Sequence, residues 1–462
     1  MFIGRRKELN ELAEKLENDR FESVLIYGRR RIGKTELIKE AAKDFDGTYI
    51  YYECKRSLLG DNLEGFNATL QRILKITFTF QTIRDAFAYV FEYAKTHRVL
   101  LVIDEFPFLW ETLPVIVSDI RDLIDEYKSQ SAMKFVLSGS YVDVMKSLND
   151  GGSETYGRFT GIIELKAFDY YEASKFYPNY SDEDKVLMYS VFGGVAFFNS
   201  LIDNSKSATD NIKRLLIEPS SILQLEIEYT ISAETSKIPA VNSVVELIGR
   251  GVTKYTDLVN ELTSRNGAKV NPDYLIKKLI DLEIIEKVVP INEKKNKKKI
   301  FYRFHDNLME FYYRYIYRNK NMNSVLSAED FYSEIVAPDL REKYLPEKFE
   351  SISKEFLIRA NKAKRIFPLI YEIGVYSFDD SKKKINRQFD VVTLDKLGYI
   401  AYECKYTDKP VGKAVINEEE YQCSSSNLDF YKLGFISKNG FTDEVDRSKY
   451  NLFTLRDFYM FE

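Results

Sequence analysis

Cysteine and histidine are scarce in this 462-residue chain. The three cysteines, Cys54, Cys404 and Cys423, are far apart and never form a CxxC pair. This spacing excludes a disulfide framework and a thiolate zinc site. The two histidines, His97 and His305, are also distant from each other, and neither lies in an HExxH motif. These absences argue against chemistry that depends on a histidine-bound metal or a histidine-containing triad.

Long apolar runs and excess charge are missing as well. No apolar stretch approaches the roughly 18 residues that indicate a membrane-spanning helix, and the start, MFIGRRKELNEL, has no hydrophobic signal region. We therefore expect a cytoplasmic protein that has no membrane partner. The formal net charge is only −4, so any contact with nucleic acid must come from local basic patches.

The composition is that of a globular protein, with 45% hydrophobic and 30% charged residues. At about 150 residues per domain, the length predicts roughly three domains. Changes of pattern along the chain place them at residues 1–230, 231–320 and 321–462.

A glycine-rich loop follows the first apolar strand. Residues 23–28 (SVLIYG) predict a buried strand, and residues 36–45 predict a helix. The loop between them matches GxxxxGK[ST] in full: Gly28, Arg29, Arg30, Arg31, Ile32, Gly33, Lys34 and Thr35. Backbone N–H groups of such a loop, together with the helix N-terminus, surround phosphate oxygens. We expect Lys34 to reach the β- and γ-phosphates of ATP and the Thr35 hydroxyl to bind Mg²⁺.

A second strand, residues 99–106 (VLLVIDEF), is continuously apolar and ends in two acids. Such runs are typical of parallel sheets buried on both faces, whose ligands bind at the carboxyl edge. We expect Asp104 to complete the Mg²⁺ shell and Glu105 to polarise the attacking water. Together with the loop, these acids predict an ATP-hydrolysing site.

Three further strands complete a five-strand α/β pattern, at residues 48–54, 134–137 and 162–165. Ser138, Gly139 and Ser140 follow the second of them, and the two serine hydroxyls either sense the γ-phosphate or belong to a simple polar turn. Arg158 precedes the last strand. It either reaches a phosphate, in its own subunit or across a boundary in a homo-oligomer, or is an ordinary surface arginine.

Several segments resemble the archaeal-type ATPases of the AAA-related, signal-transducing NTPase group. They are residues 2–9 (FIGRRKEL), the glycine-rich loop, Asp104-Glu105 and residues 137–140, 156–158 and 193–195. The resemblance implies a P-loop sheet with a helical lid, and it implies that the N-terminal segment containing Arg5 packs beside the adenine. Gly193-Gly194 would lie in the lid. The family usually has proline two residues after the second glycine, where this chain has Ala196.

Residues 241–306 carry a different pattern. Helical periodicity at residues 241–247, 255–262 and 274–282 is followed by apolar strands at 284–289 and 300–304. This is the winged-helix order. The connection between the two strands, residues 293–299, contains five lysines that could meet a DNA backbone, although exposed lysines also simply solubilise a turn and winged helices also dock proteins.

An aromatic run, residues 311–318, follows and predicts a helix that packs its aromatic face into the core rather than one that stacks on bases. Residues 319–324 (NKNMNS) predict a linker.

Two acids and a lysine form the informative set near the C-terminus: Asp390, Glu403 and Lys405. A two-residue turn at residues 396–397 would place Asp390 opposite Glu403, with Lys405 on the same face as Glu403. Opposed like charges are unfavourable unless a divalent cation lies between them. A bulge at Gly398 would instead separate the acids onto opposite faces.

This arrangement resembles the PD-(D/E)xK restriction-nuclease-like fold. The resemblance implies that Asp390 and Glu403 are Mg²⁺ ligands and that Lys405 is the catalytic lysine, with Glu350 as a further acid from the preceding helix. Gln388 stands where an acid is commoner in the family.

The expected fold class is therefore α/β: a P-loop NTPase parallel sheet with a helical lid, then a winged helix, then a restriction-nuclease-like α/β domain. Its cofactors would be ATP and Mg²⁺. Function follows one of two hypotheses. Either ATP turnover controls DNA binding or Mg²⁺-dependent DNA cleavage, or the chain is an ATP-dependent regulatory switch whose nuclease-like fold is inactive.

Overall fold

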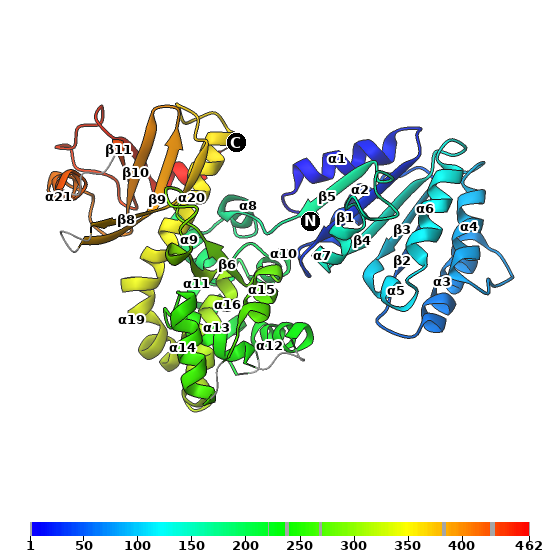
Figure 1. Ribbon diagram of the computed structural model, residues 1–462, viewed down its shortest axis with the longest axis horizontal. Helices are drawn as coiled ribbons and strands as arrows, with labels where there is room; N and C mark the ends of the chain where they lie inside the picture. The colour runs from blue at the N-terminus through cyan, green and yellow to red at the C-terminus, as the bar shows by residue number, and fades with distance from the viewer. Residues whose placement is uncertain are drawn as a thin grey trace. The chain divides into compact units, whose positions relative to one another are not determined.

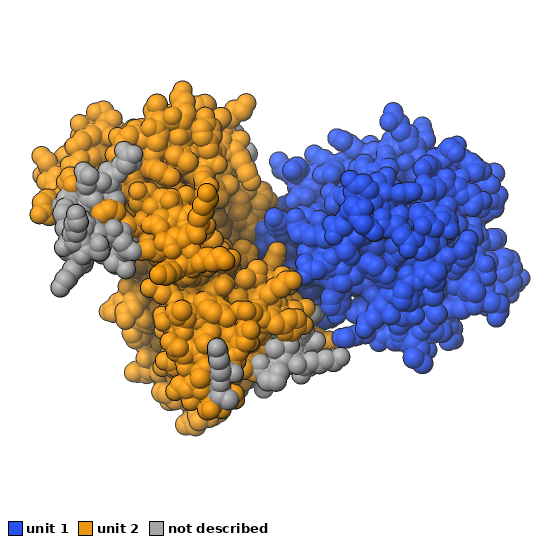
Figure 2. Space-filling view, in the orientation of Figure 1, with its two compact units in different colours: residues 1–167, 195–197 blue, residues 168–194, 198–462 orange. Residues whose placement is uncertain are grey.

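The structure is a computed structural model that describes residues 2–219, 221–235, 240–267, 270–380, 385–425 and 430–461. It consists of two units, residues 1–167 with 195–197 and residues 168–194 with 198–462 (Figure 2). The domain boundaries expected at residues 230 and 320 remain predictions. In the described part of the chain, no helix is both long enough and apolar enough to cross a membrane.

The first unit is built on a five-stranded parallel sheet (Figure 1). Its strands are β1 (Glu22–Gly28), β2 (Thr48–Glu53), β3 (Val99–Asp104), β4 (Lys134–Gly139) and β5 (Gly161–Leu165). They lie in the order β2-β3-β4-β1-β5, and every pairing is parallel. All five predicted strands are confirmed. The carboxyl ends of β1, β4 and β3 are therefore neighbours at one edge of the sheet.

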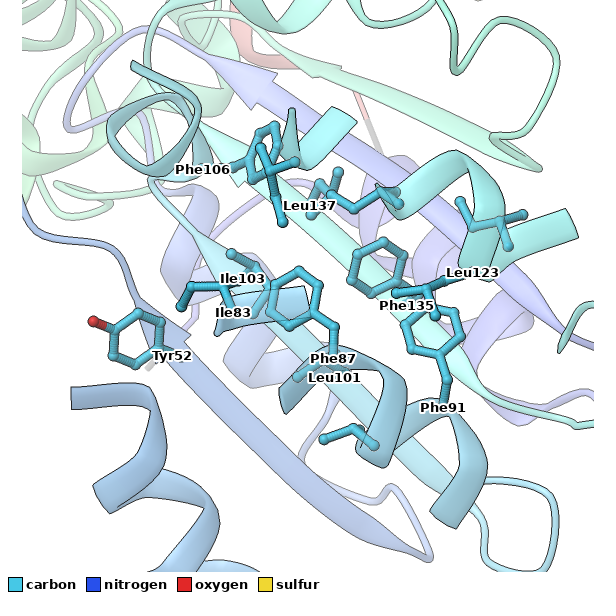
Figure 3. Close-up of a cluster of buried hydrophobic side chains, with 14 of the residues drawn as sticks. Tyr52, Ile83, Phe87, Phe91, Leu101, Ile103, Phe106, Leu123, Phe135 and Leu137 are labelled. Atoms are coloured by element: carbon cyan, nitrogen blue, oxygen red, sulfur yellow. The ribbon is translucent and has the colours of Figure 1, made fainter. Parts of the chain in front are cut away.

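Helices cover this sheet, and their aromatic side chains hold it rigidly. They are α1 (Arg6–Glu17), α2 (Lys34–Ala41), α3 (Leu59–Leu74), α4 (Ile83–Tyr93), α5 (Phe106–Thr112), α6 (Ile116–Tyr127) and α7 (Val142–Ser147). Phe87 and Phe91 of α4 pack on Phe135 of β4, with ring centroids 6.4 and 5.4 Å apart (Figure 3). Strands β1, β3 and β4 are buried at every residue, which explains their unbroken apolar sequences.

The second unit begins with short helices: α8 (Tyr170–Ser174), α9 (Asp182–Phe192), α11 (Ala208–Ile212), η1 (Lys213–Ile217) and α12 (Ile222–Thr235), while α10 (Ala196–Ser200) spans the junction. The glycine pair after α9 has a packing role. Phe168 N–H donates to the Gly194 carbonyl oxygen at 2.8 Å, and a Cβ at Gly194 would lie 1.9 Å from the Phe168 carbonyl oxygen. Only glycine allows the two backbones to approach this closely.

Three helices and a hairpin follow in the order expected from the sequence. They are α13 (Val241–Gly249), α14 (Tyr255–Asn266), α15 (Asp273–Asp281), β6 (Ile285–Val288) and β7 (Phe301–Phe304). The two strands pair antiparallel, from Ile285 opposite Phe304 to Val288 opposite Phe301.

The aromatic run packs into the core, as predicted: Tyr312, Tyr313 and Tyr315 of η3 (Tyr312–Ile316) are buried after α16 (Asn307–Phe311). The predicted linker at residues 319–324 is wrong. These residues fall mostly in η4 (Tyr317–Asn319) and α17 (Lys320–Asn323), and Lys320 forms an ion pair with Glu228 of α12 at 2.6 Å.

The last part of the chain forms a second five-stranded sheet in the order β12-β11-β10-β9-β8. Its strands are β8 (Glu372–Asp380), β9 (Ile385–Asp395), β10 (Gly398–Lys405), β11 (Phe430–Ser437) and β12 (Asn451–Thr454). Strands β8, β9 and β10 pair antiparallel, whereas β10, β11 and β12 are parallel. The long helix α20 (Leu345–Lys362) packs against β8, β9 and β10.

The described residues contain seven further helices. They are α18 (Ala328–Phe331), η5 (Tyr332–Val336), α19 (Ala337–Asp339), η6 (Leu340–Tyr344), α21 (Lys413–Ser425), the short η2 (Lys297–Lys299) and η7 (Leu455–Tyr459).

Candidate functional site

The glycine-rich loop turns tightly between β1 and α2. A Cβ at Gly28 would lie 2.2 Å from the Leu165 carbonyl oxygen, so any side chain there would collide with β5. Gly33 has a φ of +101°, a left-handed value that favours glycine, and it caps α2. Ile32 is fully buried and so fixes the loop to the protein interior. The N-terminus of α2 is thereby fixed at the carboxyl edge of the sheet, the position expected for a phosphate site.

Lys34 curls back over this loop. Its Nζ donates to the carbonyl oxygens of Gly28 at 3.0 Å and Arg29 at 3.3 Å. Burial lowers the pKa of Lys34, and the negative charges of Glu105 and Asp104 oppose that shift. The ammonium of Lys34 can form strong charge-assisted hydrogen bonds to phosphate oxygens.

The two groups expected to hold Mg²⁺ touch each other. The Thr35 hydroxyl donates to Asp104 Oδ2 at 2.8 Å, which joins the first turn of α2 to the end of β3. Sequence reasoning missed a third partner, Tyr51 of β2, whose hydroxyl donates to the same oxygen at 2.8 Å. Burial, followed by the charge of Asp104, raises the pKa of Tyr51, so the phenol stays a neutral donor. Tyr51 could have been found from the sequence, because the TYIYYE segment alternates like a strand and this strand, β2, pairs with β3.

Glu105 is held by Ser140, one of the two serines at the end of β4. Glu105 Oε2 accepts hydrogen bonds from the Ser140 hydroxyl at 2.7 Å and from the Ser140 N–H at 3.2 Å. Ser138 is fully buried within β4, and its hydroxyl makes no hydrogen bond with the described residues. Glu105 itself has a φ of +50°, which turns the chain sharply from β3 into α5. Ser140 is therefore the polar group that controls where this carboxylate lies.

Arg5 supports the loop from the N-terminal segment. Its guanidinium donates to the carbonyl oxygens of Ile32 at 3.3 Å and Lys166 at 2.5 Å. The side chain is buried, so this arginine holds backbone in place on both sides of the loop.

Arg158 lies at the other edge of the sheet. It forms an ion pair with Asp125 of α6 at 3.1 Å, and its carbonyl oxygen accepts from the Ser23 hydroxyl at the start of β1. Gly28 ends that strand five residues later, roughly 16 Å away at about 3.3 Å per residue. The structure therefore does not bring Arg158 to the phosphate loop of its own subunit, and a role in a neighbouring subunit remains a prediction.

The segment after the glycine pair returns to the loop. A Cβ built at Gly33 would lie 3.6 Å from the side chain of Ala196. Phe197 N–H donates to the Arg31 carbonyl oxygen at 3.3 Å, and the Arg31 guanidinium lies 4.1 Å from the centroid of the Phe197 ring. Residues 195–197 are thus part of the nucleotide site, with alanine where the resembling family usually has proline.

The acids of the C-terminal sheet line one pocket. Strands β9 and β10 pair from Asp395 opposite Gly398 to Val392 opposite Ala401, without a bulge at Gly398, as the two-residue turn predicts. A pocket of about 380 Å³ lies beyond this stretch. Its polar lining residues, here called the acidic pocket, are Glu350, Gln388, Asp390, Glu403, Lys405, Glu418, Glu419 and Gln422.

Negative charge dominates the acidic pocket, where five carboxylates face one lysine. Burial, followed by the charges of Asp390 and Glu403, raises the pKa of Glu350 to about 8. Lys405 contacts Glu403 directly; burial lowers the pKa of Lys405, but this contact outweighs it and the net shift is upward. Gln388 donates to Asp390 Oδ1 at 2.7 Å. Mutual repulsion of this strength favours a divalent cation.

Neither candidate cation site is a complete protein cage. Among the described residues, no group of three or more His, Cys, Asp or Glu is arranged to hold a metal ion. Mg²⁺ is commonly bound by one or two carboxylates, with waters and substrate phosphates in the remaining positions. Asp104 with Thr35 fits that requirement, and so does Asp390 with Glu403.

Comparison with known proteins agrees with the nucleotide site. Residues 2–197 match the model of an ATPase domain found predominantly in Archaea, and residues 312–420 match a family described as archaeal and bacterial proteins of unknown function. An uncharacterised protein of Methanocaldococcus jannaschii is 29% identical over 375 residues, which is 81% of each chain. An uncharacterised ATP-binding protein of the same organism is 45% identical over 40 residues, 9% of this chain and 68% of its own.

Solved structures are similar at lower identity. The Walker-type ATPase of Pyrococcus abyssi is 17% identical, with 68% of this chain and 96% of that chain covered and a TM-score of 0.49. The Aeropyrum pernix ORC2 protein in its ADPNP–ADP complexes is 15% identical, with 69% and 94% covered and a TM-score of 0.47. Residues 2–197 are thus similar to an ATPase domain found predominantly in Archaea, and this similarity supports ATP binding and hydrolysis by this part of the chain.

Proposed function

We propose that this protein is an ATPase whose nucleotide state controls DNA binding, or Mg²⁺-dependent DNA cleavage, by its C-terminal part. The observation that carries the ATPase half is the direct contact of Thr35 with Asp104, beside the buried Lys34. Lys34 and Thr35 begin α2, and Asp104 ends β3, so the three groups meet at one edge of the sheet. A Mg²⁺-bound triphosphate requires these types of group.

In this proposal each residue of the nucleotide site has one task. Loop N–H groups and Lys34 bind the phosphates, and Lys34 exchanges its bonds to the Gly28 and Arg29 carbonyls for phosphate oxygens. Thr35 and Asp104 would hold Mg²⁺, which neutralises developing charge on the transferred phosphoryl group. Glu105 accepts a proton from the attacking water once it leaves Ser140.

The acidic pocket would act on the phosphodiester backbone. Asp390 and Glu403 are its cation ligands, and Lys405 steadies the phosphate or orients a water. Helices α13, α14 and α15 with the β6–β7 hairpin are assigned as a winged helix on their order alone.

Incubation of the full chain with plasmid and linear DNA tests this function. Cleavage is measured with Mg²⁺ or Mn²⁺, with and without ATP, and with Asp390→Ala as the pocket variant. Lys34→Ala is its counterpart in the nucleotide site. Cleavage that disappears in Asp390→Ala and loses its ATP dependence in Lys34→Ala supports the proposal.

One alternative function rests on the chemistry of the same pocket. Lys405 is engaged with Glu403, Gln388 stands in place of an acid, and the raised pKa of Glu350 keeps that carboxyl mostly neutral near pH 7. These features favour a regulatory switch with a silent nuclease-like fold. DNA that stays intact under every condition, while ATP is still hydrolysed, would select this alternative.

A further inference from the structure

The lysine-rich loop, residues 293–299 between β6 and β7, is not a free tip. The segment leading into it adds onto β8, the edge strand of the C-terminal sheet. Asn292 Oδ1 accepts from the Ser377 N–H at 3.0 Å, and its Nδ2 donates to the Ser377 carbonyl oxygen at 2.8 Å. Ile291 N–H donates to the Val375 carbonyl oxygen at 2.8 Å. These three bonds satisfy backbone groups that an edge strand otherwise exposes.

Side chains strengthen this anchor. Ile291 is buried in a cluster with Val392 of β9 and Ala401 of β10. Lys294, the first lysine of the loop, forms an ion pair with Glu372 of β8 at 2.7 Å. The loop is therefore fixed to the same sheet that carries the acidic pocket.

Strand register gives the separation between the anchor and the acidic pocket. Ser377 of β8 pairs with Gln388 of β9, and Gln388 lines the acidic pocket beside Asp390. Neighbouring strands lie about 4.8 Å apart, so Asn292 and Gln388 are separated by roughly two strand spacings, about 10 Å.

The base of the same hairpin faces the helix that supplies Glu350. Arg303 of β7 forms an ion pair with Glu286 of β6 at 2.5 Å. The charges of both act on Lys354 of α20, which lies one helical turn after Glu350. The hairpin is thus held near the acidic pocket both at its base and at Asn292, where the lysine-rich loop begins.

The acidic pocket and the lysine-rich loop carry opposite charges, and the two act differently on DNA. The carboxylates of the acidic pocket outnumber its one lysine and repel a phosphodiester backbone, and a bound cation offsets only part of that repulsion. Lys295, Lys297 and Lys298 are exposed on the loop and supply the missing attraction.

We propose that the lysine-rich loop and the acidic pocket form one binding surface for a single DNA duplex. The three exposed lysines hold phosphates of the same duplex whose backbone lies at Asp390 and Glu403. This inference rests on the proposed DNA function. In this inference the hairpin binds the same DNA molecule as the pocket and positions it there, rather than making an independent DNA contact.

The test measures duplex affinity by fluorescence anisotropy across a range of KCl concentrations, with EDTA or Mg²⁺. Full-length protein carrying Lys405→Ala serves as the background, so that the duplex stays intact. Lys295, Lys297 and Lys298 are replaced together by Ser. A matched control replaces the exposed Lys206, Lys362 and Lys364 by Ser. Asn292→Ala separately loosens the anchor and keeps every lysine.

We expect the loop variant to reduce the salt slope by about 2.7, at about 0.9 per phosphate contact, and to lose most of the gain in affinity that Mg²⁺ provides. Asn292→Ala should keep the slope and lose the Mg²⁺-dependent gain, whereas the control should change neither. A loop variant that retains the full Mg²⁺-dependent gain, or an unchanged slope, overturns the shared surface and leaves the DNA function standing. Failure of the natural chain to bind the duplex at all in the presence of EDTA, where metal-dependent cleavage cannot occur, rejects the DNA function itself.

Discussion

The nucleotide site and the acidic pocket both gather acids, a lysine and a candidate Mg²⁺ position, but they are built in different ways. The nucleotide site takes its loop from eight consecutive residues and its acids from the end of a strand two positions away in the sheet. The acidic pocket takes its residues from α20, β9, β10 and α21. A site made by one loop depends on local geometry, whereas the pocket exists only if a hairpin keeps its register.

The sharpest way to separate the two sites is to remove Lys34. We expect Lys34→Ala to lower ATP hydrolysis by about 10²- to 10³-fold, because a preorganised cationic donor to the phosphates is lost. Phosphate release is the measurement, and Lys39→Ala, which removes an exposed lysine from the same helix, is the control. ATP turnover that survives Lys34→Ala would contradict the assignment of this loop.

The second prediction concerns the dependence of stability on pH. It rests on Glu355 of α20, the helix that also carries Glu350. Burial raises the pKa of Glu355 to about 7, although hydrogen bonds from Tyr170 N–H and the Tyr189 hydroxyl oppose the shift. The folded chain therefore holds a proton that the unfolded chain releases between pH 4.5 and about 7, so stability should fall as pH rises through that window. Unfolding of the second unit should show this loss.

The corresponding variant is Glu355→Gln, which cannot ionise. At about 1.4 kcal/mol per pKa unit, Glu355 contributes about 3 kcal/mol of the pH-dependent loss in the natural chain, and the variant should lack that contribution while keeping the one from Glu350, whose pKa is also raised. Chemical denaturation between pH 5 and pH 8 measures the difference. Parallel pH dependence in the two proteins would show that Glu355 ionises freely in the folded state.

The smallest expected effect concerns the restraint on Glu105. Ser140→Ala removes a hydrogen bond to a charged group, which contributes about 1.5 kcal/mol or more, so basal ATP hydrolysis should rise about tenfold as Glu105 becomes free to activate water. Ser140→Thr keeps the hydroxyl and should behave as the natural chain does. A tenfold fall in Ser140→Ala would instead place Ser140 in contact with the transition state, and ATP affinity measured beside the rate separates the two roles.

Much of the nucleotide site could be predicted because its chemistry is local. The motif from Gly28 to Thr35 specifies a turn and a helix start within a few residues, and the apolar run before Asp104 specifies a buried strand. The contact of Thr35 with Asp104 then follows from the carboxyl edge that parallel strands share. The choice between Ser138 and Ser140 does not follow, because it depends on where the strand ends and which side chain turns toward Glu105.

Predictions that depended on long-range arrangement had mixed outcomes. The two-residue turn at residues 396–397 set the expected register, and Asp390 and Glu403 share a pocket. Arg158 resembled a phosphate ligand in the sequence, but it lies at the amino edge of its own sheet, paired with Asp125. Residues 319–324 are polar enough for a linker, yet most of them lie in η4 and α17, where Lys320 pairs with Glu228 of α12.

The sequence by itself therefore determined the ATPase loop, the five parallel strands and the set of acids near the C-terminus, because each is encoded by neighbouring residues or by a strand period. Only the tertiary structure decided that Ser140 holds Glu105, that Tyr51 joins Asp104, and that the lysine-rich loop is anchored on β8 beside the acidic pocket. These outcomes join residues that lie between 35 and 85 positions apart in the chain. Such contacts are selected by packing and by the pairing of buried polar groups, which no short stretch of sequence specifies.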